Sequence, residues 1–291
     1  MASRYKRLDG FEILNYLVLT LLIFFIVYPF YYVVINSFNG LLTHRPSFFW
    51  PENFTTTCYR IVFKDKSVVD ALGMSLFRTV AGTAITITTC AFASFAMSKK
   101  YLRFRALYMV IFTIPNFFGG GIVPVYLNFR NLGMLDSVWI YILPHAFSFF
   151  YMILLLSAFR NVPESLEEAA LIDGASVFKV FMQIVIPVTV PTIATVSLYA
   201  AVGQWNAWYD TMFYTSAKSL RTISSVLMRI VRENSLQDLS SDFARDPENR
   251  AYNPEGVKMA TMIVATLPII FIYPFLQKYF VKGIMIGSIK G

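Results

Sequence analysis

The sequence predicts an all-α polytopic membrane protein with six transmembrane helices. The 291-residue chain is 56% hydrophobic and only 14% charged, whereas a soluble domain is about 25% charged. Six apolar segments each approach the roughly 20 residues that cross a bilayer. The two cysteines, Cys58 in a loop and Cys90 in an apolar run, argue against a disulfide framework or a metal site.

The six predicted spans are residues 12–37, 72–97, 106–128, 138–158, 187–213 and 257–280. The first follows basic residues as a signal peptide would, but its apolar run is far longer than a signal h-region and no small-residue cleavage site follows. We therefore expect a retained first helix.

The remaining segments are predicted to connect these spans. They are an N-terminus over 1–11, outer loops over 38–71 and 214–256, an inner segment over 159–186 and a tail over 281–291.

Basic residues predict the orientation in the membrane. The turn 98–105 carries "KKYLRFR", with four basic residues and no acid, whereas loop 214–256 mixes both signs. Short loops dominate the positive-inside rule, so we expect a multi-pass cell-membrane protein with both termini cytoplasmic. The net charge of +8 is scattered between apolar runs. This distribution favours contact with lipid headgroups over nucleic-acid binding.

The third span contains "FFGGGIVP" over 117–124, with Pro115 before it. Proline and consecutive glycines predict a break or bend in this helix. The break could serve as a gating hinge or as a static packing notch.

An acidic hairpin, "ESLEEAALIDGASVFKVFMQIVIP" over 164–187, lies between the fourth and fifth spans. Pro163 favours a helix start, and Ser165 with Glu168 forms a capping-box pattern. Gly174 can adopt the left-handed conformation that ends a helix.

A second short helix is expected to follow, capped by Ser176. Pro187 then marks the entry into the fifth span. On helix pattern alone, this hairpin is an amphipathic surface segment whose carboxylates are simply solvated.

The spacing of the hairpin resembles the EAA signature of ABC importer permeases: Glu-Ala-Ala, three residues, Gly, nine residues, then Ile-x-Ile-Pro. Ile186 replaces the leucine with which the signature usually ends. In that family the element is a coupling helix seated in a cleft of the ATP-binding subunit. The resemblance implies that the ATPase-coupling residues are Glu167, Glu168, Ala169, Ala170, Asp173, Gly174 and Pro187.

Further stretches resemble the carbohydrate-uptake, maltose-permease-like family. These are "NLGMLDS" over 131–137, "QWNAWYD" over 204–210 and the ending "QKYFVKGIMIGSIKG". The sequence as a whole is most similar to the subgroup that imports oligosaccharides and polysaccharide fragments. The resemblance implies the six-helix ABC type I importer permease fold and ATP-driven uptake by alternating access.

No phosphate-cradling G-x-x-x-x-G-K-[ST] motif occurs, so we expect no ATP hydrolysis, no catalytic residue and no cofactor or metal on this chain. The resemblance implies ATP and magnesium on a partner ATPase. The implied partners are two ATP-binding cassette subunits, a second permease subunit in a favoured heterodimer, an extracytoplasmic sugar-binding protein and membrane lipid. The alternatives are a secondary transporter or channel not coupled to ATP and, third, a membrane-embedded enzyme.

Aromatic and amide side chains within the spans are candidates for a substrate pathway, because rings stack on sugars and amides bind hydroxyls. Tyr199, Gly203, Asn206 and Asp210 are predicted to share one face of the fifth span. Trp208 and Tyr209 also fit an interfacial aromatic belt, and His145 also fits a packing role. The candidate pathway residues are Asn116, Tyr151, Tyr199, Trp205, Asn206 and Asp210.

Arg78 and Asp210 are the clearest ionisable residues within spans, at comparable predicted depth. Isolated charges there are costly. We therefore expect either an ion pair at an outer gate or two side chains that snorkel separately to the headgroups.

Overall fold

The computed structural model describes residues 10–39, 47–233 and 254–288. Most of the predicted N-terminus, part of loop 214–256 and the end of the tail lie outside this described part. The chain divides into two compact units, residues 1–66 with 230–265 and residues 67–229 with 266–291.

The first unit contains α1 (Gly10–Ser37), α2 (Thr57–Lys64) and the beginning of α14 (Pro254–Ser288). The Asn36 side chain fastens the end of α1 to the following loop, because its Nδ2 donates to the Ser47 carbonyl and its Oδ1 accepts from the Ser47 N–H, each at 2.8 Å. An isolated antiparallel bridge joins Asn39 and Phe54.

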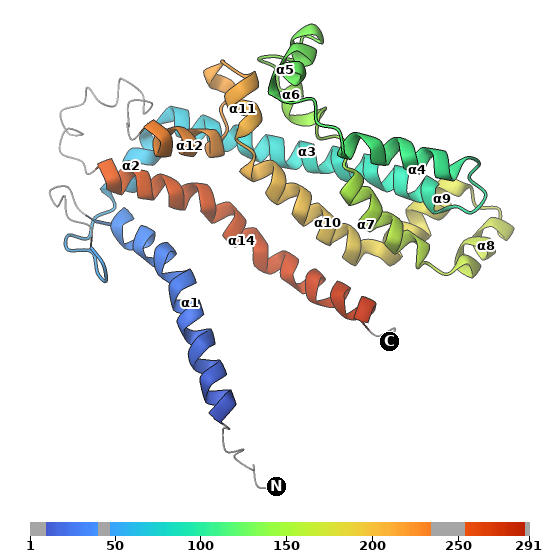
Figure 1. The fold of residues 1–291 in the computed structure, drawn as a ribbon, viewed down its shortest axis with the longest axis horizontal. Coiled ribbons are helices and arrows are strands. Elements are labelled where there is room, and N and C mark those ends of the chain that lie inside the picture. Colours follow the sequence, from blue (N-terminus) through green and yellow to red (C-terminus); the bar gives the residue numbers. More distant parts are fainter. Residues whose placement is uncertain (1–9, 40–46, 234–253, 289–291) are drawn as a thin grey trace. The chain divides into compact units, whose positions relative to one another are not determined.

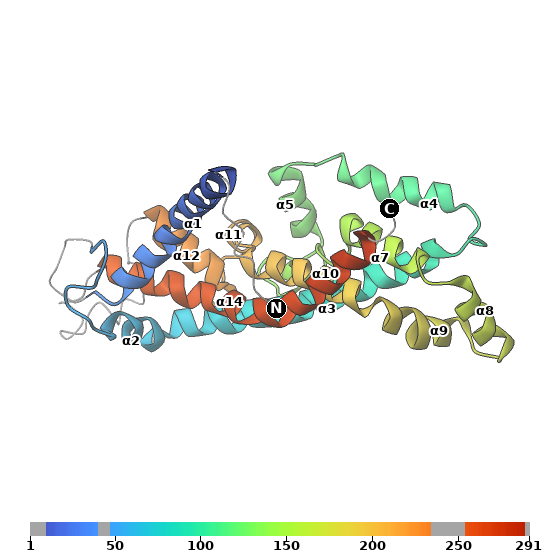
Figure 2. The ribbon, with the colours of Figure 1, turned by 90° about the horizontal axis from the view of Figure 1, so that it is seen from below.

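The second unit is built on α3 (Lys66–Ser98), which runs without interruption beside α10 (Figures 1 and 2). The other elements of the chain are α4 (Arg105–Thr113), η1 (Ile114–Asn116), α5 (Ile122–Asn131), α6 (Trp139–Ile142), α7 (Phe149–Arg160), α8 (Glu164–Ile172), α9 (Val177–Val180), the π-helix η2 (Phe181–Val185), α10 (Ile186–Asn206), α11 (Tyr209–Tyr214), η3 (Lys218–Leu220) and α12 (Ile223–Glu233). The last of these crosses the boundary between the units.

Four helical segments in the described part are long and apolar enough to cross a membrane: Gly10–Ser37, Lys66–Ser98, Val177–Asn206 and Glu255–Ile272. The predicted break in the third span is confirmed, since α4 and η1 stop at Asn116 and α5 begins after Gly121, whose φ is +77°. The fourth predicted span is also interrupted, which differs from the single helix expected.

The interruption between α6 and α7 has a clear chemical basis. Pro144 lacks a backbone N–H and cannot continue the helical hydrogen bonds. The carbonyls that the break leaves without a helical partner accept hydrogen bonds from threonine side chains of α3. Thr86 Oγ1 donates to the His145 carbonyl at 2.7 Å, and Thr89 Oγ1 donates to the Ala146 carbonyl. Satisfying these carbonyls within the protein is what allows irregular backbone at membrane depth.

The fifth predicted span ends early, and this corrects the predicted shared face. Helix α10 stops at Asn206, and Ala207 is extended with φ −71° and ψ 118°. Asp210 therefore lies in the first turn of the separate helix α11 rather than on the face that carries Tyr199 and Gly203.

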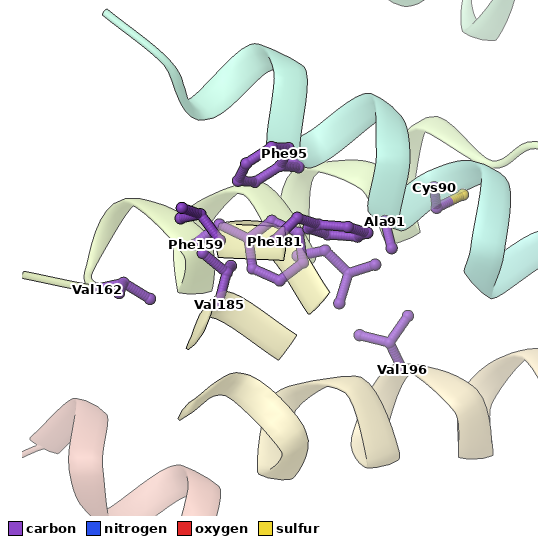
Figure 3. Close-up of a cluster of buried hydrophobic side chains, with 10 residues drawn as sticks. Cys90, Ala91, Phe95, Phe159, Val162, Phe181, Val185 and Val196 are labelled. Atoms are coloured by element: carbon purple, nitrogen blue, oxygen red, sulfur yellow. The ribbon is translucent and has the colours of Figure 1, made fainter. Parts of the chain in front are cut away.

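A hydrophobic cluster joins α3, α7, the π-helix and α10 (Figure 3). Phe181 of the π-helix is 3% exposed, and its ring centroid lies 4.7 Å from that of Phe95 and 6.3 Å from that of Phe159. Aromatic contacts of this kind add to the burial energy. The cluster therefore anchors the chain immediately before the acidic hairpin and over the second half of the hairpin.

Candidate functional site

Helix α8 is the first helix of the acidic hairpin, and it lies near the C-terminal end of α3 (Figures 1 and 2). The predicted capping box is wrong. Pro163 occupies the N-cap with φ −60° and ψ 127°, and no side chain caps the helix. Because the helix already begins at Glu164, Ser165 lies inside its first turn and cannot act as the N-cap.

The end of α8 confirms the predicted glycine terminus. Gly174 has φ +81°, the Gly174 N–H donates to the Leu171 carbonyl at 3.1 Å, and the Ala175 N–H donates to the Ala170 carbonyl at 2.9 Å. These two bonds form a Schellman motif. Ser176 then caps α9 as predicted, since its side chain accepts from the Lys179 N–H at 3.3 Å.

The predicted coupling residues divide into two groups. Glu168, Ala169, Asp173 and Gly174 are exposed, and the neighbouring Ile172 is 86% exposed. Such a combination of small, acidic and apolar exposed side chains offers a contact surface.

Of the remaining three predicted coupling residues, Glu167 and Ala170 contact other parts of the chain, and Pro187 is exposed. Glu167 pairs with Lys99, and Ala170 packs against the hydrophobic cluster. Pro187 lies in the first turn of α10, within a helical run that continues from Val177 to Asn206.

A second site is centred on Arg78, which is 1% exposed. Its Nη1 and Nη2 donate to the two carboxylate oxygens of Asp210 at 2.8 and 2.5 Å. Its Nε donates to Gln204 Oε1 at 2.9 Å, and Nη1 also donates to the Ala207 carbonyl at 3.2 Å. The guanidinium lies 4.8 Å from the centroid of the Tyr141 ring. The buried cation is therefore neutralised and hydrogen-bonded, as burial requires.

Asp210 is 6% exposed and receives two further contacts. The Thr211 N–H donates to its Oδ1 at 3.0 Å, and His145 Nε2 lies 3.3 Å from its Oδ2. The ion-pair alternative predicted for Arg78 and Asp210 is thus the arrangement observed. Its place at an outer gate stays a prediction.

Gly82 makes room for this network. A Cβ atom at position 82 would lie 2.7 Å from Gln204 Nε2 and 2.8 Å from its Cδ. A side chain at position 82 would therefore require Gln204 to shift from its place against α3, where it accepts from Arg78.

A cavity of about 720 Å³ opens beside the ion pair. Asn116 and Tyr151, two of the predicted pathway residues, line it, and so do Arg78 and His145. Tyr199, Trp205, Asn206 and Asp210 do not belong to its lining. Trp205 is 7% exposed, while Asn206 is exposed at the end of α10.

Two further lining residues, Gln204 and Thr86, did not stand out in the sequence. A polar amide inside an apolar run is the available signal for Gln204. For Thr86 there is none, because a threonine on a helix commonly bonds only to its own backbone.

Discontinuous helices around a cavity are a recurrent feature of membrane transport proteins. Residues 87–286 match the family described as the inner membrane component of binding-protein-dependent transport systems. The chain belongs to this family, and its fold is that of an ABC type I importer permease.

Individual relatives agree with this membership. The chain is 36% identical to the protein LplC of Bacillus subtilis strain 168 over 91% of this chain and 90% of the relative. It is 34% identical to the polygalacturonan/rhamnogalacturonan transport system permease protein YtcP of the same strain, over 97% and 98%. A crystal structure of a bacterial ABC transporter involved in the import of the acidic polysaccharide alginate superposes with a TM-score of 0.88 at 27% identity, covering 96% of this chain and 100% of that chain.

Proposed function

We propose that this chain is a permease subunit that passes oligosaccharide fragments of acidic polysaccharides through the cavity beside Arg78. The cavity carries the proposal, because it combines aromatic, amide and hydroxyl groups from five separate helical segments. None of its lining residues is a carboxylate, and the charge of Arg78 is balanced by Asp210, so the lining does not repel an anionic sugar. The names of the polygalacturonan and alginate relatives support the same substrate class.

The exposed face of α8 is the proposed contact with a separate ATPase. Glu168, Ala169 and Ile172 lie on the surface, where they can enter a cleft of that subunit. ATP and magnesium are then bound by the ATPase, and this chain performs no catalysis. Two such ATPases, a second permease in a heterodimer and an extracytoplasmic sugar-binding protein complete the proposed importer.

The orientation follows from the same contact. The turn 98–105 and α8 must face the cytoplasmic ATPase, so both termini are proposed to be cytoplasmic. The outer loops 38–71 and 214–256 then face the binding protein.

The proposal is tested by measuring sugar uptake in cells that lack this gene and in the same cells after the gene is restored. Complemented cells should accumulate labelled oligogalacturonides or alginate oligosaccharides when ATP is present, whether or not the proton gradient is collapsed. Uptake that follows the proton gradient and survives ATP depletion would instead establish a secondary transporter.

Crosslinking tests the docking face independently. Ile172→Cys should crosslink to an ATPase subunit, whereas Thr88→Cys, exposed on the middle of α3, should not. Crosslinks from position 172 to lipid alone would contradict the coupling role.

A further inference from the structure

Lys99, the first residue after α3, holds α8 through a partly buried ion pair. Its ammonium donates to the Glu167 carboxylate, and the two side chains are 10% and 18% exposed. The same ammonium lies 4.1 Å from the centroid of the Phe95 ring. Reduced solvent screening strengthens both interactions relative to a surface pair.

The neighbouring pair provides an internal comparison. Lys100 Nζ lies 2.7 Å from Glu164 Oε1, but these side chains are 79% and 62% exposed. Both pairs join the same two segments with the same chemistry. Exposed pairs contribute little, so the Lys99 pair is the stronger of the two links.

Helix α8 has few other attachments to the body of the second unit. None of its residues is buried, and Ala170 is its member packed against the hydrophobic cluster. The Glu167 carboxylate is bound to Lys99, in contrast to the exposed Glu168 beside it. Glu167 is therefore occupied inside the chain rather than free for a partner.

Helix α3 connects this link to the cavity. It contains 33 residues in one uninterrupted helix, and Arg78 and Lys99 are separated along it by about 30 Å at 1.5 Å per residue. One ion pair thus holds the coupling helix at the end of α3, and the other forms part of the cavity wall.

We propose that the Lys99–Glu167 ion pair is a positioning link that makes α8 move together with α3, so that displacement of α8 by the ATPase reaches the Arg78–Asp210 wall directly. This inference rests on the proposed function. Lys99 and Glu167 touch neither sugar nor nucleotide; they set the mechanical connection between the two sites.

The test compares Lys99→Gln with Lys100→Gln in the complete transporter reconstituted in liposomes. Lys99→Gln should raise the ATP hydrolysed per sugar imported by about threefold or more, the size of effect expected when a coupling contact is lost. Glu167→Gln should match it, while Lys100→Gln should keep the parental ratio.

Labels on Ile172 and Thr88, both exposed, measure the link itself. In the parent the distance distribution between these labels should be the same with and without trapped ATP, and Lys99→Gln should broaden it. A structural role alone would reduce the amount of assembled transporter while leaving the ratio and the distances per complex unchanged. That result would overturn the proposal, as would equal ratios in the Lys99 and Lys100 variants. If the parental transporter imports no oligosaccharide with ATP, the proposed function fails instead.

Discussion

The two ion pairs attached to α3 differ in burial and in the number of partners. Arg78 and Asp210 are almost fully buried, and each nitrogen of the guanidinium donates a hydrogen bond. Lys99 and Glu167 are partly exposed, with one carboxylate oxygen and one ring as partners of the ammonium. The comparison teaches that the Arg78–Asp210 pair is part of the packed wall, whereas the Lys99–Glu167 pair connects two helical segments with less packing around it.

Removing the buried cation should give the largest effect. Arg78→Met leaves Asp210 buried without its main partner and should destabilise the chain by about 3–5 kcal/mol. Denaturant titration in mixed micelles measures the free energy of unfolding. The Arg78→Met/Asp210→Leu double variant should recover most of the loss, because neither charge remains. A double variant as unstable as the single one would contradict the pairing.

Filling the space at Gly82 should weaken the same wall indirectly. Gly82→Ala would bring a Cβ to 2.7 Å from Gln204 Nε2 and should cost about 1–3 kcal/mol through overpacking. Gly73→Ala on the same helix is the matched control. Position 73 has no atom within 4 Å of an added Cβ, so this change should be neutral or stabilising. Equal stability of the two variants would show that Gln204 does not need the space.

Straining the end of α8 should affect the Lys99–Glu167 connection. Gly174 has φ +81°, a conformation that costs a residue with a Cβ about 1–2 kcal/mol. Gly174→Val should therefore displace α8 and lower oligosaccharide uptake, while Gly174→Asn, which tolerates this conformation, should lower it less. Uptake per assembled transporter is the measurement, and identical losses would point to a role other than backbone conformation.

The exposed carboxylate of Asp136 adds a third case to the comparison, and the loss of its charge should have the smallest effect on stability. Asp136 Oδ1 accepts from the Ser216 and Ala217 N–H groups at 2.5 and 2.9 Å, and these bonds lower the pKa of Asp136 below its ordinary value of 3.8. A lowered pKa in the folded chain means that this contribution is present above pH 3.8 and is lost as the pH falls through the folded value. The protection of the Ser216 and Ala217 amides against hydrogen exchange, relative to unfolded amides at the same pH, should therefore fall only in strong acid, and Asp136→Asn should remove that pH dependence of the protection.

The sequence predicted local features well where one residue type has one physical consequence. Glycine at position 174 ended a helix, Ser176 capped the next, and the glycines before Ile122 broke the third span. The capping box failed because the helix begins two residues earlier, with Pro163 at the N-cap. Sequence patterns locate a helix end but do not fix its register.

Interactions between distant segments were harder to foresee. Opposite charge and similar depth predicted an ion pair between Arg78 and Asp210. Nothing in the sequence indicated that Gln204 and the Ala207 carbonyl would also accept hydrogen bonds from Arg78. The end of α10 at Asn206 was missed too, since its neighbours remain apolar and carry no proline.

The sequence by itself determined that this chain crosses a membrane, carries an acidic hairpin and belongs with importer permeases, because hydropathy and motif spacing are properties of the linear chain. Only the tertiary structure decided that Glu167 faces Lys99, that Gly82 makes room for Gln204 and that a cavity opens beside Arg78. These features depend on which side chains meet across helices, and that meeting is set by packing in three dimensions.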